Sequence, residues 1–182
     1  MFVTEKEIKN RALSLELRAK GIITAPGGLF VISRRKEIDR LLARGIYDLI
    51  THNTAGLNCI FGSRIVDEVK GKEAIPFEKS RLVVQAFNNK GKDNILTALL
   101  TIQKISQRLI LVLAPALFST SIKLALRDIT QAYVQLTSLL KRLFFCLLPK
   151  EIRDEFPSNI LLRIIRPLYG ITESGTYWFN IY

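Results

Sequence analysis

The spacing of apolar residues predicts helices at several places in the chain, because these residues recur at intervals of three and four. The first helix is expected over residues 5–20. Thr4 and Glu7 have the spacing of a capping box at its start, and Gly21 suits a left-handed cap at its end. The same periodicity predicts two more helices, over residues 35–44 and 95–118, and a further helix is expected over residues 130–140.

Ser33 and Pro115 shape two of these later helices, one as an expected cap and one as an interruption. Ser33 is the predicted cap of the helix over residues 35–44, whose apolar stripe is formed by Ile38, Leu41 and Leu42. Pro115 interrupts the helical pattern over residues 95–118, since proline lacks the backbone N–H that a helix interior uses.

Extended segments rich in branched residues lie between the helices. Strands are expected at residues 46–50, 59–69, 77–87, 123–129, 144–148 and 159–166. The second and third of these flank the polar turn Lys70-Gly71-Lys72-Glu73, so we expect them to pair as an antiparallel hairpin. The order of elements indicates an α+β fold, with an antiparallel sheet packed on helices.

Charge changes this picture by suggesting a partner. Lys and Arg total 27 against 16 Asp and Glu, a formal net charge of +11. Such an excess favours a polyanionic partner, either nucleic acid or an acidic membrane surface.

A zinc site and a disulfide scaffold are both disfavoured, because Cys59 and Cys146 are the two cysteines and His52 is the one histidine. Both cysteines are interpreted as buried thiols in a reducing compartment.

Hydropathy argues against a membrane span. The most apolar run, residues 109–118, is shorter than the roughly 20 residues that a bilayer requires. The first residues, Met1 to Lys6, lack the apolar core of a signal peptide. These observations predict no membrane partner and a cytoplasmic or nuclear location.

One segment offers metal chemistry. Asp128 comes at the end of the expected strand over residues 123–129, and Tyr133 follows five residues later. A carboxylate at a strand end can bind Mg²⁺ together with phosphate oxygens, and an aromatic ring there can pack against a nucleotide sugar. On spacing alone, a helix N-cap is the more common role for such an Asp.

Four blocks in order resemble the reverse transcriptases of copia-type retrotransposons. Asp128 to Tyr133 resembles the first catalytic motif, and the basic stretch Lys79-Ser80-Arg81 to Phe87 resembles the fingers strand. The other two blocks are Ser106-Gln107-Arg108-Leu109, and Pro167-Leu168-Tyr169-Gly170-Ile171 with Tyr177-Trp178-Phe179 downstream. The resemblance extends over residues 60–182, with weaker similarity over 34–50. It implies a helical or linker segment at 1–55, then polymerase fingers and an incomplete palm at 56–182.

The resemblance also implies an activity and its residues. The family is an RNA-directed DNA polymerase of transposable elements that transfers nucleotides with two Mg²⁺ ions. Asp128 would be the catalytic residue and metal ligand, and Tyr133 would lie under the sugar of the incoming nucleotide. Lys79 and Arg81 would contact the triphosphate, since a positive fork suits its charge.

Further expectations follow from the same family. Tyr169 and Gly170 would lie beside the nucleotide and template. The partners would be an RNA template with a DNA primer, deoxynucleoside triphosphates, and other segments of a polyprotein. The family's Tyr-x-Asp-Asp motif lies downstream of the Trp-containing helix, and the 182 residues contain no Asp-Asp dipeptide. We therefore expect a fragment that binds Mg²⁺ weakly and is inactive alone.

Two alternatives stay open. The first is a non-catalytic, basic nucleic-acid-binding module, favoured by four cations between residues 94 and 127 with no acidic residue among them: Lys104, Arg108, Lys123 and Arg127. The second is an unstable fragment with uncovered apolar faces. For Lys79 and Arg81, a solvated strand face is about as well supported as phosphate contact. Core packing is the preferred role of Tyr177, Trp178 and Phe179.

Overall fold

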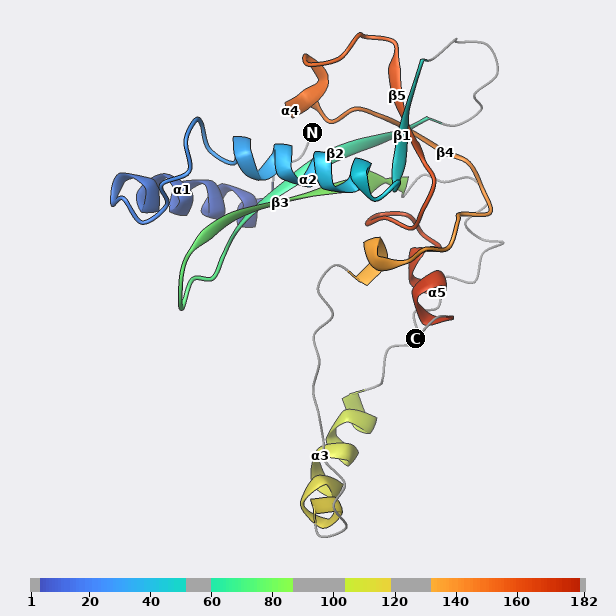
Figure 1. The fold of residues 1–182 in the computed structure, drawn as a ribbon. Helices are drawn as coiled ribbons and strands as arrows, with labels where there is room; N and C mark the ends of the chain where they lie inside the picture. The colour runs from blue at the N-terminus through green and yellow to red at the C-terminus, as the bar shows by residue number, and fades with distance from the viewer. Residues whose placement is uncertain (1–3, 52–59, 87–103, 119–131, 181–182) are drawn as a thin grey trace.

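The structure is a computed structural model and describes residues 4–51, 60–86, 104–118 and 132–180 (Figure 1). It is a mixed α/β arrangement of one five-stranded sheet and several helices. The elements are α1 (Glu5–Ala19), α2 (Val31–Ala43), β1 (Tyr47–Thr51), β2 (Ile60–Lys70), β3 (Phe77–Gln85), α3 (Lys104–Phe118), the 3₁₀ helix η3 (Ala132–Gln135), β4 (Phe144–Leu147), α4 (Lys150–Arg153), β5 (Ile160–Ile164) and α5 (Ser174–Phe179).

The sheet has the strand order β1-β5-β4-β2-β3. Three neighbouring pairs are antiparallel, but β2 and β4 run parallel where Ile60 and Phe61 face Phe145 and Cys146. The expectation of an antiparallel sheet is therefore wrong in this one pair, and the sheet is mixed. Strand direction here depends on how the long connection between β2 and β4 returns to the sheet, which periodicity does not encode.

The predicted hairpin is confirmed. β2 and β3 pair antiparallel over nine residue pairs, from Gly62 opposite Gln85 to Lys70 opposite Phe77. Side chains alternate along β3, so that Ser80, Leu82 and Val84 are buried while Lys79 and Arg81 are half-buried on the other face. The hairpin thus has one face for packing and one that carries cations.

The core lies between the sheet, α2 and the loop after β5. Its side chains with under 2% exposure include Leu41, Tyr47, Leu82, Leu162 and Leu168. Removing such side chains from water supplies the main driving force for folding. Cys146 is also fully buried, and burial raises the pKa of its thiol to about 12, as expected for an unreactive core thiol.

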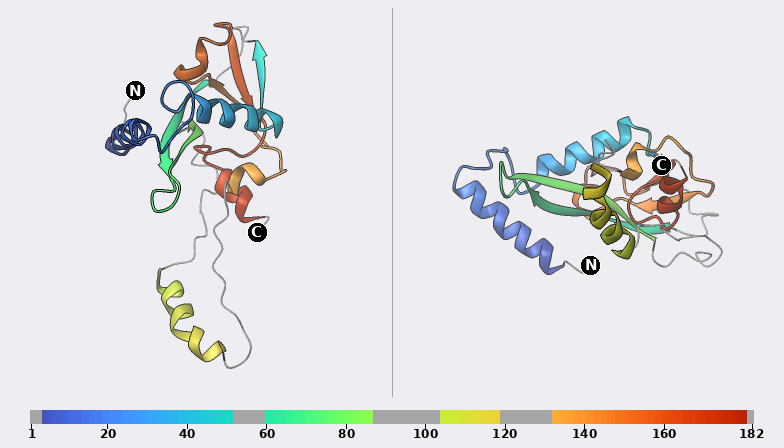
Figure 2. Two further views of the ribbon diagram at one scale, coloured as in Figure 1. Left: turned by 60° about the vertical axis from the view of Figure 1, so that its left-hand side comes forward. Right: turned by 90° about the horizontal axis from the view of Figure 1, so that it is seen from below.

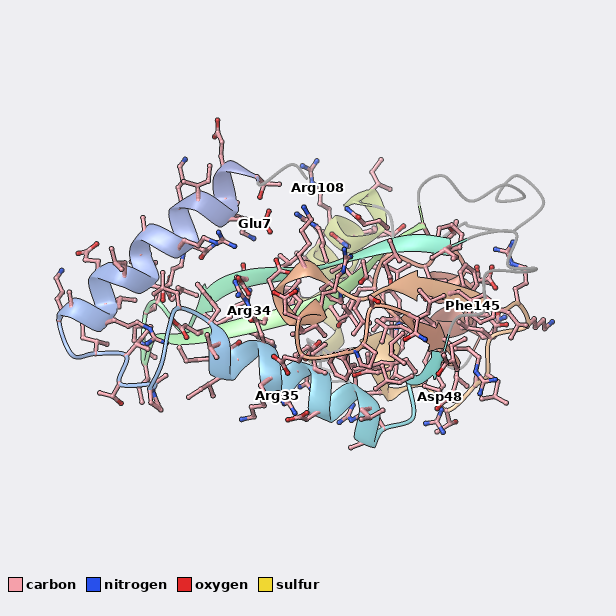
Figure 3. The ribbon with its side chains drawn as sticks, turned by 90° about the horizontal axis from the view of Figure 1, so that it is seen from above. Glu7, Arg34, Arg35, Asp48, Arg108 and Phe145 are labelled. Atoms are coloured by element: carbon pink, nitrogen blue, oxygen red, sulfur yellow. The ribbon has the colours of Figure 1, made fainter. Side chains whose placement is uncertain are left out.

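α1 and α2 run along either side of the β2–β3 hairpin (Figure 3). Glu78 of β3 joins them, with its side chain only 3% exposed. Arg18 of α1 donates two hydrogen bonds of 2.8 Å to its carboxylate, Ser14 donates one of 2.5 Å, and the backbone N–H of Phe30 donates one of 3.0 Å. A buried carboxylate with this many donors is stabilised in its charged form.

Asp67 of β2 forms the second attachment. Arg34 of α2 donates to both of its carboxylate oxygens, and Ser80 donates a hydrogen bond of 2.8 Å to one of them. Figure 3 shows Arg34 reaching from α2 over the hairpin, whereas Arg35 lies on the outer side of the helix, where it pairs with Glu155. Two buried carboxylates of the hairpin are thus neutralised by arginines of the two helices.

α2 ends at Ala43, within one residue of the expected end, and α1 agrees with the sequence at both ends. The capping box of α1 is present, with Thr4 and Glu7 exchanging both hydrogen bonds. α2 begins at Val31 rather than at residue 35, because Phe30 adopts a left-handed φ of 61°, is fully buried and donates its N–H to Glu78. Ser33 is therefore inside the helix, and Leu42 is exposed rather than in the apolar stripe.

The helix expected over residues 130–140 is also wrong where the structure describes it. Only Ala132–Gln135 form a turn of 3₁₀ helix. The next residues instead bond to distant segments: Leu140 donates its N–H to the Ile165 carbonyl, and Lys141 donates to the Tyr177 hydroxyl. These long-range bonds replace those that a helix would make.

The segments expected at residues 1–55 and 56–182 share one sheet, because β1 of the first pairs with β5 of the second over five residues.

α3 lies apart from the sheet in Figure 1 and in the left view of Figure 2, and it continues through Pro115 to Phe118. Several of its apolar side chains are exposed: Ile105, Leu109, Ile110, Leu111, Val112 and Leu113. None of the helices in the described ranges combines the length and apolarity that a membrane span needs.

Glu78→Ala should destabilise the fold markedly, because it leaves Arg18 and the Phe30 N–H without their buried acceptor. We expect the free energy of unfolding at pH 7 to fall by about 3 kcal/mol. Burial alone would raise the pKa of Glu78, but the hydrogen bonds from Arg18 and Ser14 outweigh it and hold the pKa below the usual 4.5. This contribution is present above pH 4.5 and is lost as pH falls through the folded-state pKa.

The control is Glu16→Ala, which removes an exposed pair between α1 and its C-cap Lys20 and should leave the free energy of unfolding nearly unchanged. Urea unfolding of both variants at pH 7 and pH 3 measures these differences. An equal loss of unfolding free energy in the two variants would contradict the role of Glu78 in joining α1 and α2 to the hairpin. A loss in Glu78→Ala that is as large at pH 3 as at pH 7 would contradict it too.

Candidate nucleotide site

Three aromatic and basic residues from distant parts of the chain meet at the sheet. The Cζ atom of Arg81 on β3 lies 5.9 Å from the ring centroid of Tyr169, in the loop after β5. The ring of Tyr133 in η3 packs edge-on against that of Tyr169, with centroids 5.4 Å apart. Both contacts have geometries typical of cation–π and aromatic pairs. All three residues belong to blocks that the sequence singled out.

The loop that carries Tyr169 is fixed by backbone bonds. Val84 of β3 donates its N–H to the Tyr169 carbonyl at 2.9 Å. The Ser174 hydroxyl accepts from the N–H of Leu168 and donates to its carbonyl, and both residues are buried. These bonds hold Tyr169 beside β3, so its ring position follows from the backbone rather than from side-chain freedom.

Gly170 makes this close approach possible. Its φ is +88°, a conformation that residues with a Cβ rarely adopt, and a Cβ at this position would lie 1.9 Å from the Val84 carbonyl oxygen. Gly170 therefore has a defined backbone role at the junction of the Tyr169 loop with β3. Its expected place beside a nucleotide stays a prediction.

The electrostatics of the site are positive. Lys79 lies two residues before Arg81 on the same face of β3. Burial lowers the pKa of Lys79, and the charges of Arg81 and Arg40 lower it further. Burial raises the pKa of Tyr169, an effect that Arg81 opposes and Tyr133 reinforces. Lys79, whose pKa burial and the neighbouring arginines lower, thus lies in a group of cations suited to an anionic ligand, whose charge would relieve their repulsion.

The other predicted site residues are not part of this cluster. Asp128, Lys123 and Arg127 lie outside the described residues, so their placement stays a prediction. Lys104 is the first residue of α3, and Arg108 lies one turn further on, exposed to solvent (Figure 3). Since α3 lies apart from the sheet, the structure does not bring these two cations to the Arg81–Tyr169 contact.

The described residues do not assemble a metal site. Within them, no three side chains of the types His, Cys, Asp and Glu come together with the spacing that a metal ion needs. The Mg²⁺ expectation therefore rests on Asp128 and on the family resemblance, and we derive no chemical step through a metal.

Sequence reasoning missed three arginines near this site. Arg40 lies close enough to Lys79 and Tyr169 to affect both of their pKa values. Arg44 donates to the Val134 carbonyl at 3.3 Å, and Arg166 donates to the Arg44 carbonyl at 2.9 Å. The spacing of Lys36, Arg40 and Arg44 at intervals of four was a signal for a basic helix face, but it does not reveal what the face lies against.

Comparisons with protein-family models, with curated proteins and with solved structures gave no match.

Gly170→Ala should disrupt the Tyr169 loop, because the new methyl group would collide with backbone that is part of the sheet. We expect a loss of about 3 kcal/mol in the free energy of unfolding. Gly27→Ala is a matched control, since Gly27 has a similar φ of +79° but nothing within 4 Å of its Cβ position. This control should cost only about 1 kcal/mol. Thermal or urea unfolding compares the two, and equal losses would show that the contact with Val84 is unimportant.

Proposed function

We propose that this chain is the fingers and part of the palm of a retrotransposon reverse transcriptase of the copia type, an RNA-directed DNA polymerase. The observation that carries the proposal is the meeting of Arg81, Tyr169 and Tyr133. In the sequence these residues stand 36 or more positions from one another. The resemblance would place all three around one nucleotide, so their convergence in the fold supports it.

The geometry supports a division of roles at this site. Lys79 and Arg81 on the outer face of the β2–β3 hairpin would bind the triphosphate of the incoming nucleotide, since a guanidinium donates two parallel hydrogen bonds to phosphate oxygens. Tyr133 would lie under the sugar, and its packing against Tyr169 would hold it in place. In this proposal Asp128, five residues before Tyr133, is the metal ligand.

The proposal includes partners and a location. An RNA template with a DNA primer and deoxynucleoside triphosphates would be the ligands, in the cytoplasm or the nucleus. The residues of this chain provide few of the carboxylates that two-metal transfer requires: they lack an Asp-Asp dipeptide, and Asp154 and Glu155 are exposed around the end of α4, a remote element. We therefore propose binding without catalysis for these 182 residues by themselves.

The second candidate is a non-catalytic, basic nucleic-acid-binding module. It is favoured by the net charge of +11 and by the cations of the site, neither of which requires polymerase chemistry. The two candidates differ in the role of Arg81. In a polymerase fold it would bind a triphosphate specifically, whereas in a general binding module it would contribute no more to ligand affinity than any other exposed cation.

Arg81→Ala should weaken the binding of a deoxynucleoside triphosphate in the presence of Mg²⁺, measured by isothermal titration calorimetry. Losing charge-assisted hydrogen bonds should raise Kd by about tenfold or more. Arg81→Lys keeps the charge but not the bidentate geometry and should be intermediate. Lys72→Ala, in the exposed hairpin turn, is the charge-matched control and should leave Kd unchanged. A similar loss in Arg81→Ala and Lys72→Ala would favour the second candidate.

The purified 182-residue chain should incorporate no nucleotide in a primer-extension assay on an RNA–DNA hybrid with Mg²⁺, because it contains no Asp-Asp dipeptide that could hold two metal ions together with Asp128. Incorporation that disappears in Asp128→Asn would contradict the proposed lack of catalysis, while establishing Asp128 as a metal ligand.

A further inference from the structure

One face of α2 carries a row of cations that the proposed nucleotide site does not use. Lys36, Arg40 and Arg44 stand at intervals of four residues and so lie along one side of the helix. The row spans eight residues, which corresponds to about 12 Å along the helix axis. Arg166, from the segment after β5, extends it past the end of α2 by its bond to the Arg44 carbonyl. We call these four residues the basic row.

The row connects two hollows. The first, of about 210 Å³, lies between α2 and β3 and includes Lys36, Arg40 and Lys79 among its lining residues. Of its two carboxylates, Glu37 pairs with Arg40 through one oxygen, while its buried Oε1 has no hydrogen-bond partner among the described residues. Glu78 is held by Arg18, Ser14 and the Phe30 N–H. The positive charges of Lys36 and Lys79 are therefore the ones available to a ligand in this hollow.

The second hollow, of about 430 Å³, lies at the end of α2. It is lined by Arg44, Arg166 and the η3 segment from Val134 to Leu136, and none of these described lining residues is acidic. Among the described residues, the Nε atom of Arg166 is buried and has no hydrogen-bond partner. A buried guanidinium nitrogen without an acceptor is costly, and a phosphate oxygen would supply one.

Within the described residues, the charges of the row are not paired with carboxylates, apart from that of Arg40. Among the described residues, the ion pairs include Arg40 with Glu37 but none with Lys36, Arg44 or Arg166. By contrast, the neighbouring arginines Arg34 and Arg35 are both paired, with Asp67 and Glu155. The basic row thus differs in charge from the positions of α2 that carry Arg34 and Arg35.

We propose that the basic row binds successive phosphates of a single nucleic-acid strand. A strand suits the row better than an isolated phosphate, because its cations are spread over about 12 Å of helix and continue to Arg166. Contacts of this kind position a strand without reading its sequence. The inference does not depend on Asp128 or on the Arg81–Tyr169 contact, although Lys79, which is also proposed to bind the triphosphate, borders the row in the first hollow.

The test measures the binding of the full chain to a fluorescein-labelled, single-stranded oligonucleotide by anisotropy over a series of salt concentrations. Lys36→Gln, Arg44→Gln and Arg166→Gln together should make the slope of log K against log salt shallower by about 2, or about 0.7 for each lost phosphate contact. The control Lys9→Gln, Lys72→Gln and Lys150→Gln removes the same charge from exposed positions outside the row and should change the slope by much less.

Because Arg166 also bonds to backbone, the double variant Lys36→Gln and Arg44→Gln provides a second measurement. Both side chains are exposed, and the bond from Arg44 to the Val134 carbonyl is long at 3.3 Å, so thermal unfolding of this variant should change little. Its slope should still be shallower by about 1.4. Equal slope changes in the row and control variants would mean that only net charge matters and would overturn the proposal.

Competition with inorganic tripolyphosphate separates a strand from a short polyphosphate. We expect tripolyphosphate to displace the oligonucleotide only weakly, with little difference between the unchanged chain and the double variant. If tripolyphosphate instead binds tightly and loses affinity in the double variant while the oligonucleotide does not, the row is a small-polyphosphate site and the proposal is wrong. Neither result bears on the loss of triphosphate binding in Arg81→Ala, which tests the proposed function.

Discussion

The arrangement of this protein depends on neutralising two carboxylates that the β2–β3 hairpin buries. Glu78 and Asp67 could not stay charged in the interior without partners, because an isolated buried carboxylate is far too costly. Arg18 of α1 and Arg34 of α2 supply the opposite charge, and Ser14 and Ser80 supply further donors. The N-terminal helices are therefore part of the hairpin's own structure, and the hairpin's inner face becomes a surface on which both helices must sit.

This constraint also determines what the other face of the hairpin can do. Residues alternate along β3, so anchoring Glu78, Ser80 and Leu82 inward leaves Lys79 and Arg81 on the opposite face. The loop after β5 then brings Tyr169 under Arg81 through the bond between Val84 and the Tyr169 carbonyl. A rigid, buried face on one side of a strand thereby holds cations on the other side in fixed positions, as a phosphate site requires.

The cations of the chain divide into two groups with different surroundings. Arg18, Arg34 and Arg142 are committed to carboxylates with little exposure, Glu78, Asp67 and Glu173. The cations along α2 and at Arg166 lie beside hollows instead, where anionic ligands have access. The net charge of +11 is consequently not spread evenly, and the excess near the C-terminal end of α2 lies next to η3, which carries Tyr133. If both proposals hold, the nucleotide site and the basic row are neighbours, because Arg44 bonds to Val134, the residue after Tyr133.

The sequence by itself determined the elements whose signals are local. The capping box of Thr4 and Glu7 and the β2–β3 hairpin across its Gly-containing turn were predicted and are present, because a few neighbouring residues supply their hydrogen bonds and turn conformation. The resemblance also drew attention to Arg81, Tyr133 and Tyr169 before their proximity was known. For Asp128, Lys123 and Arg127 the sequence remains the only basis, since they lie outside the described residues.

The tertiary structure decided everything that depends on distant partners. It made β2 and β4 parallel, started α2 at a buried Phe30, and replaced an expected helix by bonds from Leu140 to Ile165 and from Lys141 to Tyr177. It also placed Arg166 against Arg44 to complete the basic row. The reason is physical. Periodicity and propensity report which conformation a short segment prefers by itself, whereas these features exist because donors and acceptors are paired with groups far away in the sequence, in one case more than a hundred residues away.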